Sequence, residues 1–318
     1  MEANSNNPYL LYRFGDYYGL GNEGISRSHI KSRKFLRLVS DDTEHLVLTL
    51  DALNRTTDPI DFTLHLKRNL RTWLITLPPG IGLATLKACA LMWVTSHSGR
   101  FSAGNGPLMR VLPIVDKIPS HKRLPYLEAS TKLTHTDPKA MTAVNALNLL
   151  LESLYSNTLQ DVSFLNSYLL LSAEVQWHKY VNALKAGFEN NVSLESLLQS
   201  INCGTGISGY CYHTILAVTA ITLYGIHHGY TAAQFFEETL KAGGDTDSTC
   251  ALIGAIVGIK FPNHRVPYES IDYPLTSTLL QQVVTGGSLP KLYFFTYFIR
   301  NILSYPFILG YALIRRLI

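Results

Sequence analysis

Apolar side chains recur at intervals of three and four residues along most of this 318-residue chain, which is the spacing of an α-helical face. Residues 43–53, for example, place Leu46, Leu50 and Leu53 on one helical stripe. Few stretches alternate with a period of two, and no Asn-Gly turn joins two β-branched runs. The same periodicity predicts helices over residues 59–75, 83–96, 138–156, 207–224, 232–242 and 248–259. We therefore predict an all-α fold, with one compact domain over residues 1–270 and a C-terminal extension over residues 271–318.

The composition narrows the class of protein further. Hydrophobic residues make up 47% of the chain and charged residues 16%, which excludes disorder for most of its length. A net charge of +4 over 318 residues gives no direct signal for nucleic acid. The four cysteines form no Cys-x-x-Cys pair, and the N-terminus lacks the basic start and apolar run of a signal peptide. We therefore expect an intracellular, cytoplasmic protein without a zinc cluster or redox pair.

The last segment of the chain differs from the rest. Residues 292–314 are apolar apart from Arg300 and a few small polar groups, and about 20 apolar residues suffice to cross a bilayer. Arg300 and Pro306 count against a spanning helix, since an arginine at the membrane centre costs roughly 2.5–3.5 kcal/mol. Two interpretations stay open: two short helices that cover the domain or a partner, or an anchoring hairpin that gives peripheral membrane association through residues 292–318.

Two short acidic motifs each stand just before a helical pattern: SDDT at 40–43 and GGDTDS at 243–248. One interpretation is helix capping, because Ser, Thr and Asp are preferred N-cap residues and first-turn acids stabilise a helix by about 0.3–1 kcal/mol each. Capping needs only one acid, however, and adjacent carboxylates repel each other. A stripe of small residues after Asp247 also predicts a closely packed helix with a buried N-terminus, where unpaired carboxylates are costly.

A hard divalent cation is the second interpretation of these motifs. Mg²⁺ and Mn²⁺ prefer carboxylate, hydroxyl and water oxygens, and the two helix starts offer enough of them for two ions if they converge. Zinc is disfavoured because no Cys or His accompanies the acids. The predicted metal ligands are Ser40, Asp41, Asp42, Asp245, Asp247 and Ser248.

A third polar element is GDYYGLGNE at residues 15–23. We predict that it forms a glycine-rich turn after a shortened first helix, PYLLYRF, and that Glu23 supplies a further carboxylate at its end. Taken alone, it is typical of a loop with a solvated acid.

In their order along the chain, these segments resemble the ADP-ribosylglycohydrolase family, which includes the ADP-ribosyl-acceptor hydrolases and dinitrogenase-reductase-activating glycohydrolase. GDYYGLGNE is similar to the family's Gly-Asp-x-x-Gly-x-x-x-Glu, SDDT to its Thr/Ser-Asp-Asp-Thr, and GGDTDS to its Gly-Gly-Asp-Thr-Asp-Thr/Ser. Three further segments keep the family order: SAGNGPLMRVLPI at 102–114, LTHTDPKA at 133–140 and GTGISGYCYHTILAV at 204–218. The likeness runs from residue 10 to about residue 262, and the apolar segment beyond residue 290 is not part of it.

This resemblance implies a compact all-α fold with a central cleft that holds two Mg²⁺ or Mn²⁺ ions on the six ligands named above. Glu23, Asp41 and Asp42 match the catalytic carboxylates. The implied substrate-binding residues are Ser102, Gly104, Asn105 and Gly106 at the diphosphate and ribose, His135 in the cleft, and Gly206 and Ile207 near the adenosine.

The implied activity is hydrolysis of the glycosidic bond between ADP-ribose and an acceptor. The acceptor would be a modified protein side chain or a small ADP-ribose conjugate, and arginine, serine and other linkages stay open, as does the oligomeric state. The family scaffold also occurs in catalytically silent relatives with binding or structural roles. Such relatives usually lose metal ligands, which this sequence retains.

Overall fold

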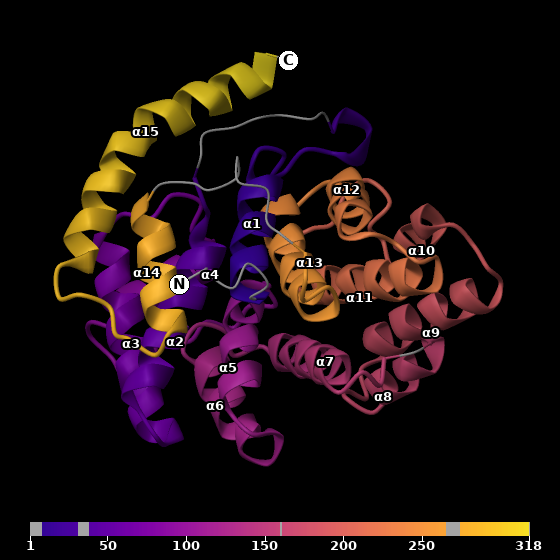
Figure 1. Ribbon diagram of the computed structural model, residues 1–318, viewed down its shortest axis with the longest axis horizontal. Helices are drawn as coiled ribbons and strands as arrows, with labels where there is room; N and C mark the ends of the chain where they lie inside the picture. Colours follow the sequence, from indigo (N-terminus) through magenta and orange to yellow (C-terminus); the bar gives the residue numbers. More distant parts are fainter. Residues whose placement is uncertain (1–7, 31–37, 160, 265–273, 318) are drawn as a thin grey trace.

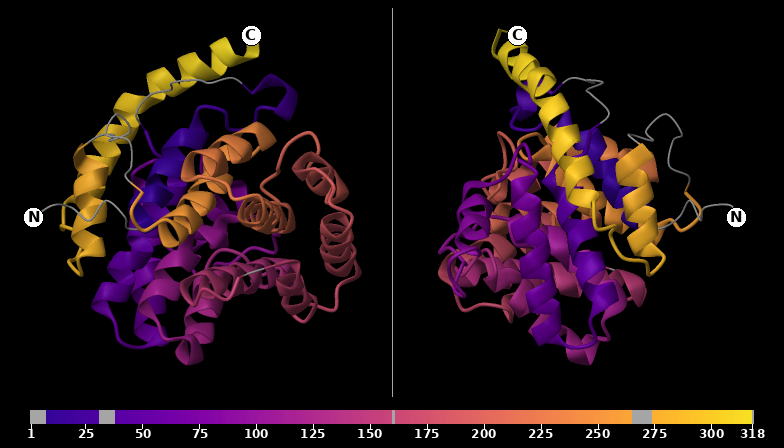
Figure 2. Two further views of the ribbon diagram at one scale, coloured as in Figure 1. Left: turned by 45° about the vertical axis from the view of Figure 1, so that its right-hand side comes forward. Right: turned by 90° about the vertical axis from the view of Figure 1, so that its left-hand side faces the viewer.

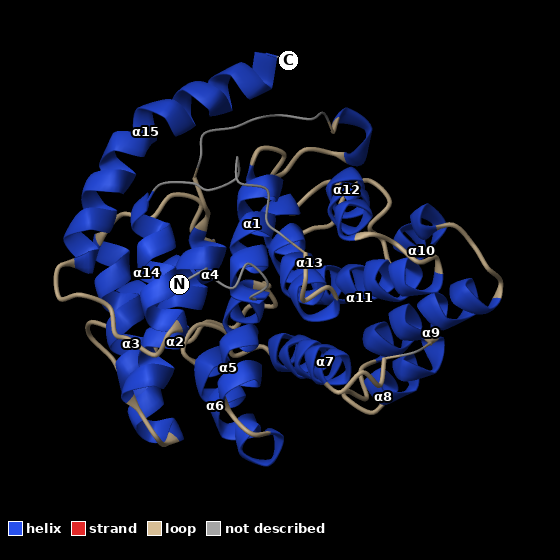
Figure 3. Cartoon of the chain, viewed as in Figure 1, coloured by secondary structure: helices blue, strands red, loops and turns tan. Residues whose placement is uncertain are grey.

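A computed structural model describes residues 8–30, 38–159, 161–264 and 274–317 of the chain. Over these residues the protein is built from helices joined by loops, and no strand is formed apart from isolated bridging pairs (Figure 3). The α-helices are α1 (Pro8–Leu20), α2 (Asp41–Arg55), α3 (Pro59–Ile75), α4 (Leu83–Leu91), α5 (Val111–Lys117), α6 (Ser120–Lys132), α7 (Pro138–Tyr155), α8 (Leu165–Leu169), α9 (Val175–Glu189), α10 (Leu194–Ser200), α11 (Cys211–His227), α12 (Ala232–Ala242), α13 (Thr246–Lys260), α14 (Pro274–Val284) and α15 (Tyr293–Leu317). Short 3₁₀ helices cover Arg27–His29, Gly106–Arg110 and Val162–Phe164. The predicted all-α class is confirmed.

Most predicted helices are found close to their expected bounds because local signals set their starts. Asp58 caps α3, since its carboxylate accepts hydrogen bonds from the backbone N–H of Ile60 and Asp61. Asp137 caps α7 in the same way, and a proline follows each cap in the first helical turn. The helix expected over 83–96 ends earlier, at Leu91, and the one expected over 207–224 begins later, at Cys211.

The prediction of a shortened first helix is wrong. α1 runs on through Gly15 and Gly19 to Leu20, and it packs along α13 in the most extensive helix–helix contact of the described chain (Figure 1). A Cβ atom on Gly15 would lie 1.9 Å from the Cys250 carbonyl oxygen, and one on Gly19 would lie 2.0 Å from that of Thr246. The missing side chains therefore allow the two helix backbones to touch. Because this contact is tertiary, glycines that read locally as a turn are helical here.

α13 contributes to the same contact through its own small residues. A Cβ atom on Gly254 would lie 2.0 Å from the Leu11 carbonyl oxygen, and one on Gly258 would meet Pro8. All of the first turn of α13 is buried, as the stripe of small residues predicted. Close packing of α1 on α13 thus places the N-terminal turn of α13 in the protein interior, next to the C-terminal turn of α1.

The C-terminal segment forms α14 and α15, which pack against α2 and α3 respectively. α15 is one helix that passes through Pro306, so the expected pair of short helices, or a hairpin, is wrong. It arches along the outside of the body, and its last turns extend past the other helices (Figures 1 and 2). Within the described ranges, no helix combines the length and the apolar character needed to cross a membrane. The predicted boundary at residue 270 lies outside the described residues.

Candidate metal and ligand site

A cavity of about 710 Å³ lies where the N-termini of α2 and α13 meet several glycine-rich loops. Most residues that the sequence predicted for metal or substrate binding line it, although they come from six separate segments of the chain. They are Glu23, Asp41, Ser102, Gly104, Asn105, Gly106, His135, Gly206, Ile207, Asp245, Asp247 and Ser248. The remaining two, Ser40 and Asp42, are buried next to this lining. The structure thus brings the predicted residues together, while their roles stay predictions.

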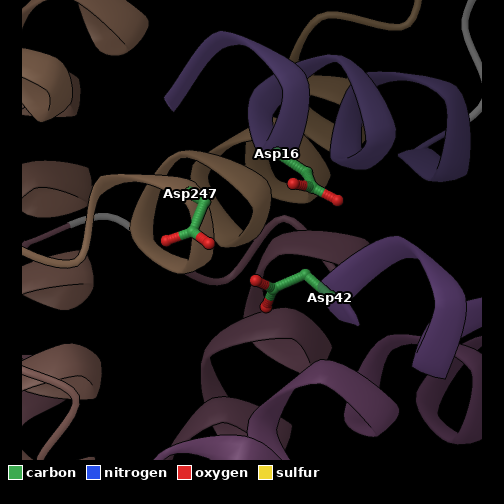
Figure 4. Close-up of side chains that lie close together, drawn as sticks. All are labelled: Asp16, Asp42 and Asp247. Atoms are coloured by element: carbon green, nitrogen blue, oxygen red, sulfur yellow. The ribbon is translucent and has the colours of Figure 1, made fainter. Parts of the chain in front are cut away.

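Three buried carboxylates form the centre of this site. Asp16 of α1, Asp42 of α2 and Asp247 of α13 can each offer an oxygen such that the three lie within 4.8 Å of one another. Figure 4 shows the three side chains converging from their separate helices. Such a cluster of oxygen donors matches the preference of a hard divalent cation.

Asp16 was not among the predicted ligands. Its carboxylate accepts hydrogen bonds from the backbone N–H of Ser40, at 3.0 and 3.1 Å, and from the backbone N–H of Thr43, at 3.1 Å. The hydroxyl of Thr43 donates to it as well, at 2.5 Å. Asp16, on α1, therefore accepts hydrogen bonds from the donors at the start of α2. The Gly-Asp pair at the start of GDYYGLGNE carries this signal, but its glycines predict a turn and not the helix that presents Asp16.

The two motif serines bind Asp42. Ser40 is the N-cap of α2: its hydroxyl accepts from the backbone N–H of Asp42 at 3.1 Å and donates to the Asp42 carboxylate at 2.9 Å. The Ser248 hydroxyl, from α13, donates to the same carboxylate oxygen at 3.1 Å. Capping is therefore real at Ser40. It does not account for Asp247, whose Oδ1 atom is buried without a hydrogen-bond partner in the described structure.

The electrostatics of the cluster also indicate a cation. Burial raises the pKa of Asp16 to about 6, against an ordinary value of 3.8. Burial, reinforced by neighbouring carboxylates, raises the pKa of Asp41, Asp42 and Asp247 well above the usual range for aspartate. These groups destabilise one another when they are ionised. A divalent cation would remove that repulsion and supply the partner that Asp247 Oδ1 lacks, so the residues fit such an ion.

Asp245 is held differently from the three clustered aspartates. Its backbone N–H donates to the Ile207 carbonyl at 2.7 Å, and its carboxylate accepts from the Asn105 side-chain amide at 2.6 Å. Gly244 precedes it with a φ of +84°, where a Cβ atom would lie 2.0 Å from the Ile207 carbonyl oxygen. The glycine thus permits the close contact between two loops that fixes Asp245 on the cavity wall beside Asn105.

His135 is placed by a buried chain of hydrogen bonds. The Arg110 guanidinium donates to the Thr134 hydroxyl at 2.7 Å, and that hydroxyl lies 2.9 Å from His135 Nδ1. Arginine can only donate, so the Thr134 hydroxyl accepts from the guanidinium while it also lies within hydrogen-bond distance of His135 Nδ1. Burial and the charge of Arg110 lower the pKa of His135 to about 3. The cavity is therefore lined by a neutral imidazole, which lies beside Gly104 and Gly106.

Comparison with known proteins agrees with this architecture. The sequence model of the ADP-ribosylglycohydrolase family matches residues 13–284. An uncharacterised protein of Archaeoglobus fulgidus is 29% identical, in an alignment that covers 82% of this chain and 88% of that protein. A solved structure described as an ADP-ribosylglycohydrolase-related protein complex is similar in fold, with a TM-score of 0.60 and 20% identity over 89% of this chain and 96% of the other.

Proposed function

This chain belongs to the ADP-ribosylglycohydrolase family, and on that basis we propose that it is a metal-dependent hydrolase that cleaves the glycosidic bond between ADP-ribose and an acceptor. It would thereby reverse ADP-ribosylation of a protein side chain or release ADP-ribose from a small conjugate. One observation carries the proposal: Asp16, Asp42 and Asp247 converge in the protein interior at the wall of a cavity that is large enough for a nucleotide-sized ligand.

The residues that would hold the cation are Asp16, Asp42 and Asp247, with Asp41, Asp245 and the two serine hydroxyls around them. When bound, divalent cations supply positive charge that orients the ribose hydroxyls and favours ionisation of a water molecule. Two ions, Mg²⁺ or Mn²⁺, are part of the proposal, because the site offers carboxylate and hydroxyl oxygens on both the α2 side and the α13 side.

The loop around Gly104 and Gly106 would receive the diphosphate. Glycines leave the backbone open to a bulky anion, and a Cβ atom on Gly104 would lie 3.0 Å from His135 Nε2. The same ring nitrogen presents a hydrogen-bonding group at this place, which suits a ribose hydroxyl. Ser102 and Asn105 add polar groups to this part of the wall, and Gly206 and Ile207 line the part that we assign to the adenosine.

The bond-breaking step would pass through an oxocarbenium-like state at the ribose carbon. Glu23 and Asp41 line the cavity: Glu23 would accept the proton of the attacking water, and the Asp41 carboxylate would stabilise the developing positive charge on the sugar, with Asp42 behind it as a ligand of the cation. The acceptor group would leave with the proton that Glu23 takes from the water, so the reaction balances as the addition of one water molecule across the glycosidic bond. This scheme requires no covalent nucleophile. The groups that would assist the reaction are carboxylates of this chain.

The test is direct incubation of the protein with ADP-ribose linked to arginine, to serine and to a nucleotide, with Mg²⁺ or with EDTA, and detection of free ADP-ribose. We expect release from at least one conjugate with Mg²⁺ only. Asp247→Asn and Asp41→Asn are expected to abolish it. Asp61→Asn, at an exposed position in the first turn of α3, is the matched control and should keep full activity.

Two other outcomes would contradict the proposal in different ways. Turnover that persists in Asp247→Asn or in EDTA would remove the cation from the mechanism. Binding of ADP-ribose in a titration calorimeter, without release from any conjugate, would instead identify a catalytically silent member of the family.

A further inference from the structure

α15 has the reverse of the polarity expected for a helix on a protein surface. Its outward face, over the residues whose side chains are described, is wholly apolar. The exposed residues on that face are Leu292, Phe295, Ile299, Ile302, Leu303, Pro306, Phe307 and Leu309. The face turned to the protein carries Tyr293, Tyr297, Arg300, Asn301 and Ser304, all buried. A helix in contact with water would present these two sets the other way round.

Specific contacts fix this orientation. The buried guanidinium of Arg300 forms an ion pair with the buried carboxylate of Glu44 in α2. The side-chain amide of Asn301 donates to the Thr76 carbonyl at 2.8 Å, just after α3. Turning the apolar face inward would break both contacts and leave charged groups without partners in the interior, which is strongly unfavourable. The apolar face of α15 is therefore held outward.

The apolar surface continues beyond the helix. The Tyr305 hydroxyl donates to the Leu77 carbonyl at 3.0 Å, and the Leu77 side chain is half exposed there. Contiguous apolar surface of this kind on a folded protein marks a site of contact with another phase or partner.

The charge and polarity of this segment indicate whether a protein or a lipid bilayer covers the outward face of α15. Residues 274–318 contain no Asp or Glu, while they include Lys291, Arg315 and Arg316 in addition to Arg300, whose charge is paired with Glu44. A segment that is positive and free of carboxylates complements an anionic surface. Protein interfaces carry about one hydrogen bond per 100–200 Å², whereas the exposed residues described on the outward face of α15 are all apolar and the Tyr305 hydroxyl beside them already donates to the Leu77 carbonyl. Contact with lipid acyl chains requires no hydrogen-bonding side chain.

We propose that α15 is a docking surface for an anionic lipid bilayer. The helix would lie along the bilayer surface, with Phe295, Ile299, Leu303 and Phe307 among the acyl chains and basic residues at the headgroups. Its inner face stays on α2 and α3, so the enzyme body rests on the membrane. This inference is independent of the reaction proposed for the cavity.

The experiment is flotation of the full chain with vesicles of phosphatidylcholine alone and of phosphatidylcholine mixed with phosphatidylserine. We expect binding to the mixed vesicles that weakens as salt is raised. The triple variant Ile299→Ser, Leu303→Ser and Phe307→Ser should bind at least about 1,000-fold more weakly, since each buried side chain of this kind contributes about tenfold or more.

The control variant replaces three apolar side chains that are exposed elsewhere, Leu124→Ser, Leu170→Ser and Val175→Ser, and should bind like the wild type. Circular dichroism verifies that each variant is folded, and the single variant Phe307→Ser serves if the triple variant is not. Failure of the wild type to float with anionic vesicles, or equal binding by the triple variant, would overturn the proposal. A dimer by light scattering that only the triple variant disrupts, without vesicle binding, would assign this face to a second copy instead.

Discussion

Replacing Asp16 with asparagine tests whether this residue belongs to a cation site. Its carboxylate is fully buried and accepts hydrogen bonds from the backbone of Ser40 and from the backbone and hydroxyl of Thr43. An asparagine has the same shape and keeps one oxygen. That oxygen can take the position of Asp16 Oδ2, which accepts from both the backbone N–H and the hydroxyl of Thr43. The bond from Ser40 to the other oxygen is lost, because that position becomes an amide NH₂. The substitution thus removes the charge while it preserves most of the geometry.

The stability change depends on pH in a predictable direction. Burial raises the pKa of Asp16 from 3.8 to about 6, so the folded protein retains this proton where the unfolded chain has already released it. Below about pH 4 the group is neutral in both states and costs nothing. Between about pH 4 and 6 only the unfolded chain is ionised at this group, so the free energy of unfolding falls by about 3 kcal/mol in the absence of a cation and stays at that level above pH 6. Asp16→Asn removes that loss, and its weakened hydrogen bonding costs about 1 kcal/mol at every pH.

We therefore expect a crossover between the two proteins in EDTA. At pH 4 the variant should be less stable than the wild type by about 1 kcal/mol, and at pH 7 more stable by about 1–2 kcal/mol. Mg²⁺ should reverse the order at pH 7, because saturation to 100 times the dissociation constant stabilises the wild type by about 2.7 kcal/mol and the variant much less.

Urea unfolding followed by tryptophan fluorescence measures these differences, since Trp73 and Trp177 are buried. Asp61→Asn, which changes an exposed carboxylate, should show neither the crossover nor a reduced response to Mg²⁺. If Mg²⁺ stabilises Asp16→Asn as much as the wild type, Asp16 is no ligand. If the crossover is absent, burial does not govern the ionisation of this carboxyl.

Three further substitutions probe the supports of the site. Gly19→Ala forces a methyl group to within 2.0 Å of a carbonyl oxygen of α13, and urea unfolding should show a loss of stability of about 3 kcal/mol or more. The control is Gly82→Ala, which has open space around it and should change stability by less than about 1 kcal/mol. Arg300→Met leaves the buried Glu44 without its cation and should cost about 3–5 kcal/mol, much of which the additional change Glu44→Gln should restore. Thr134→Val removes the hydroxyl that holds the cleft imidazole and should raise KM for an ADP-ribose conjugate about tenfold with little change in kcat, as measured by steady-state kinetics.

The features that sequence predicted correctly are set by neighbouring residues. The cap at Asp58 followed by a proline fixes the start of α3, and the motif serine at position 40 caps α2. The stripe of small residues after Asp247 predicted the buried start of α13, because small side chains at helical spacing allow another backbone to approach. Each of these signals lies within one or two helical turns of its effect.

Asp16 shows where such local signals end. Gly15 and Gly19 lower the helix propensity of their segment by about 1 kcal/mol each, so a turn was the reasonable expectation. In the fold, the same glycines remove the side chains that would keep α1 away from α13, and the packing gained outweighs the propensity lost. The helical turn then directs Asp16 at Asp42 and Asp247. Which acids converge is therefore decided by a helix pair whose members lie more than 200 residues apart in the chain.

α15 makes the same point for the C-terminus. In the sequence, Arg300 counts against a membrane-spanning helix but gives no sign of its partner, Glu44, which stands two residues after Asp42 at the start of α2. The ion pair neutralises the arginine on the inner face, so the outer face can be apolar without interruption from Leu292 to Leu309. The first turn of α2 thus carries both a carboxylate of the candidate cation site and the anchor of the proposed membrane surface. A cation that orders this turn should therefore also tighten the attachment of α15, which hydrogen exchange of the α15 amides with and without Mg²⁺ would measure.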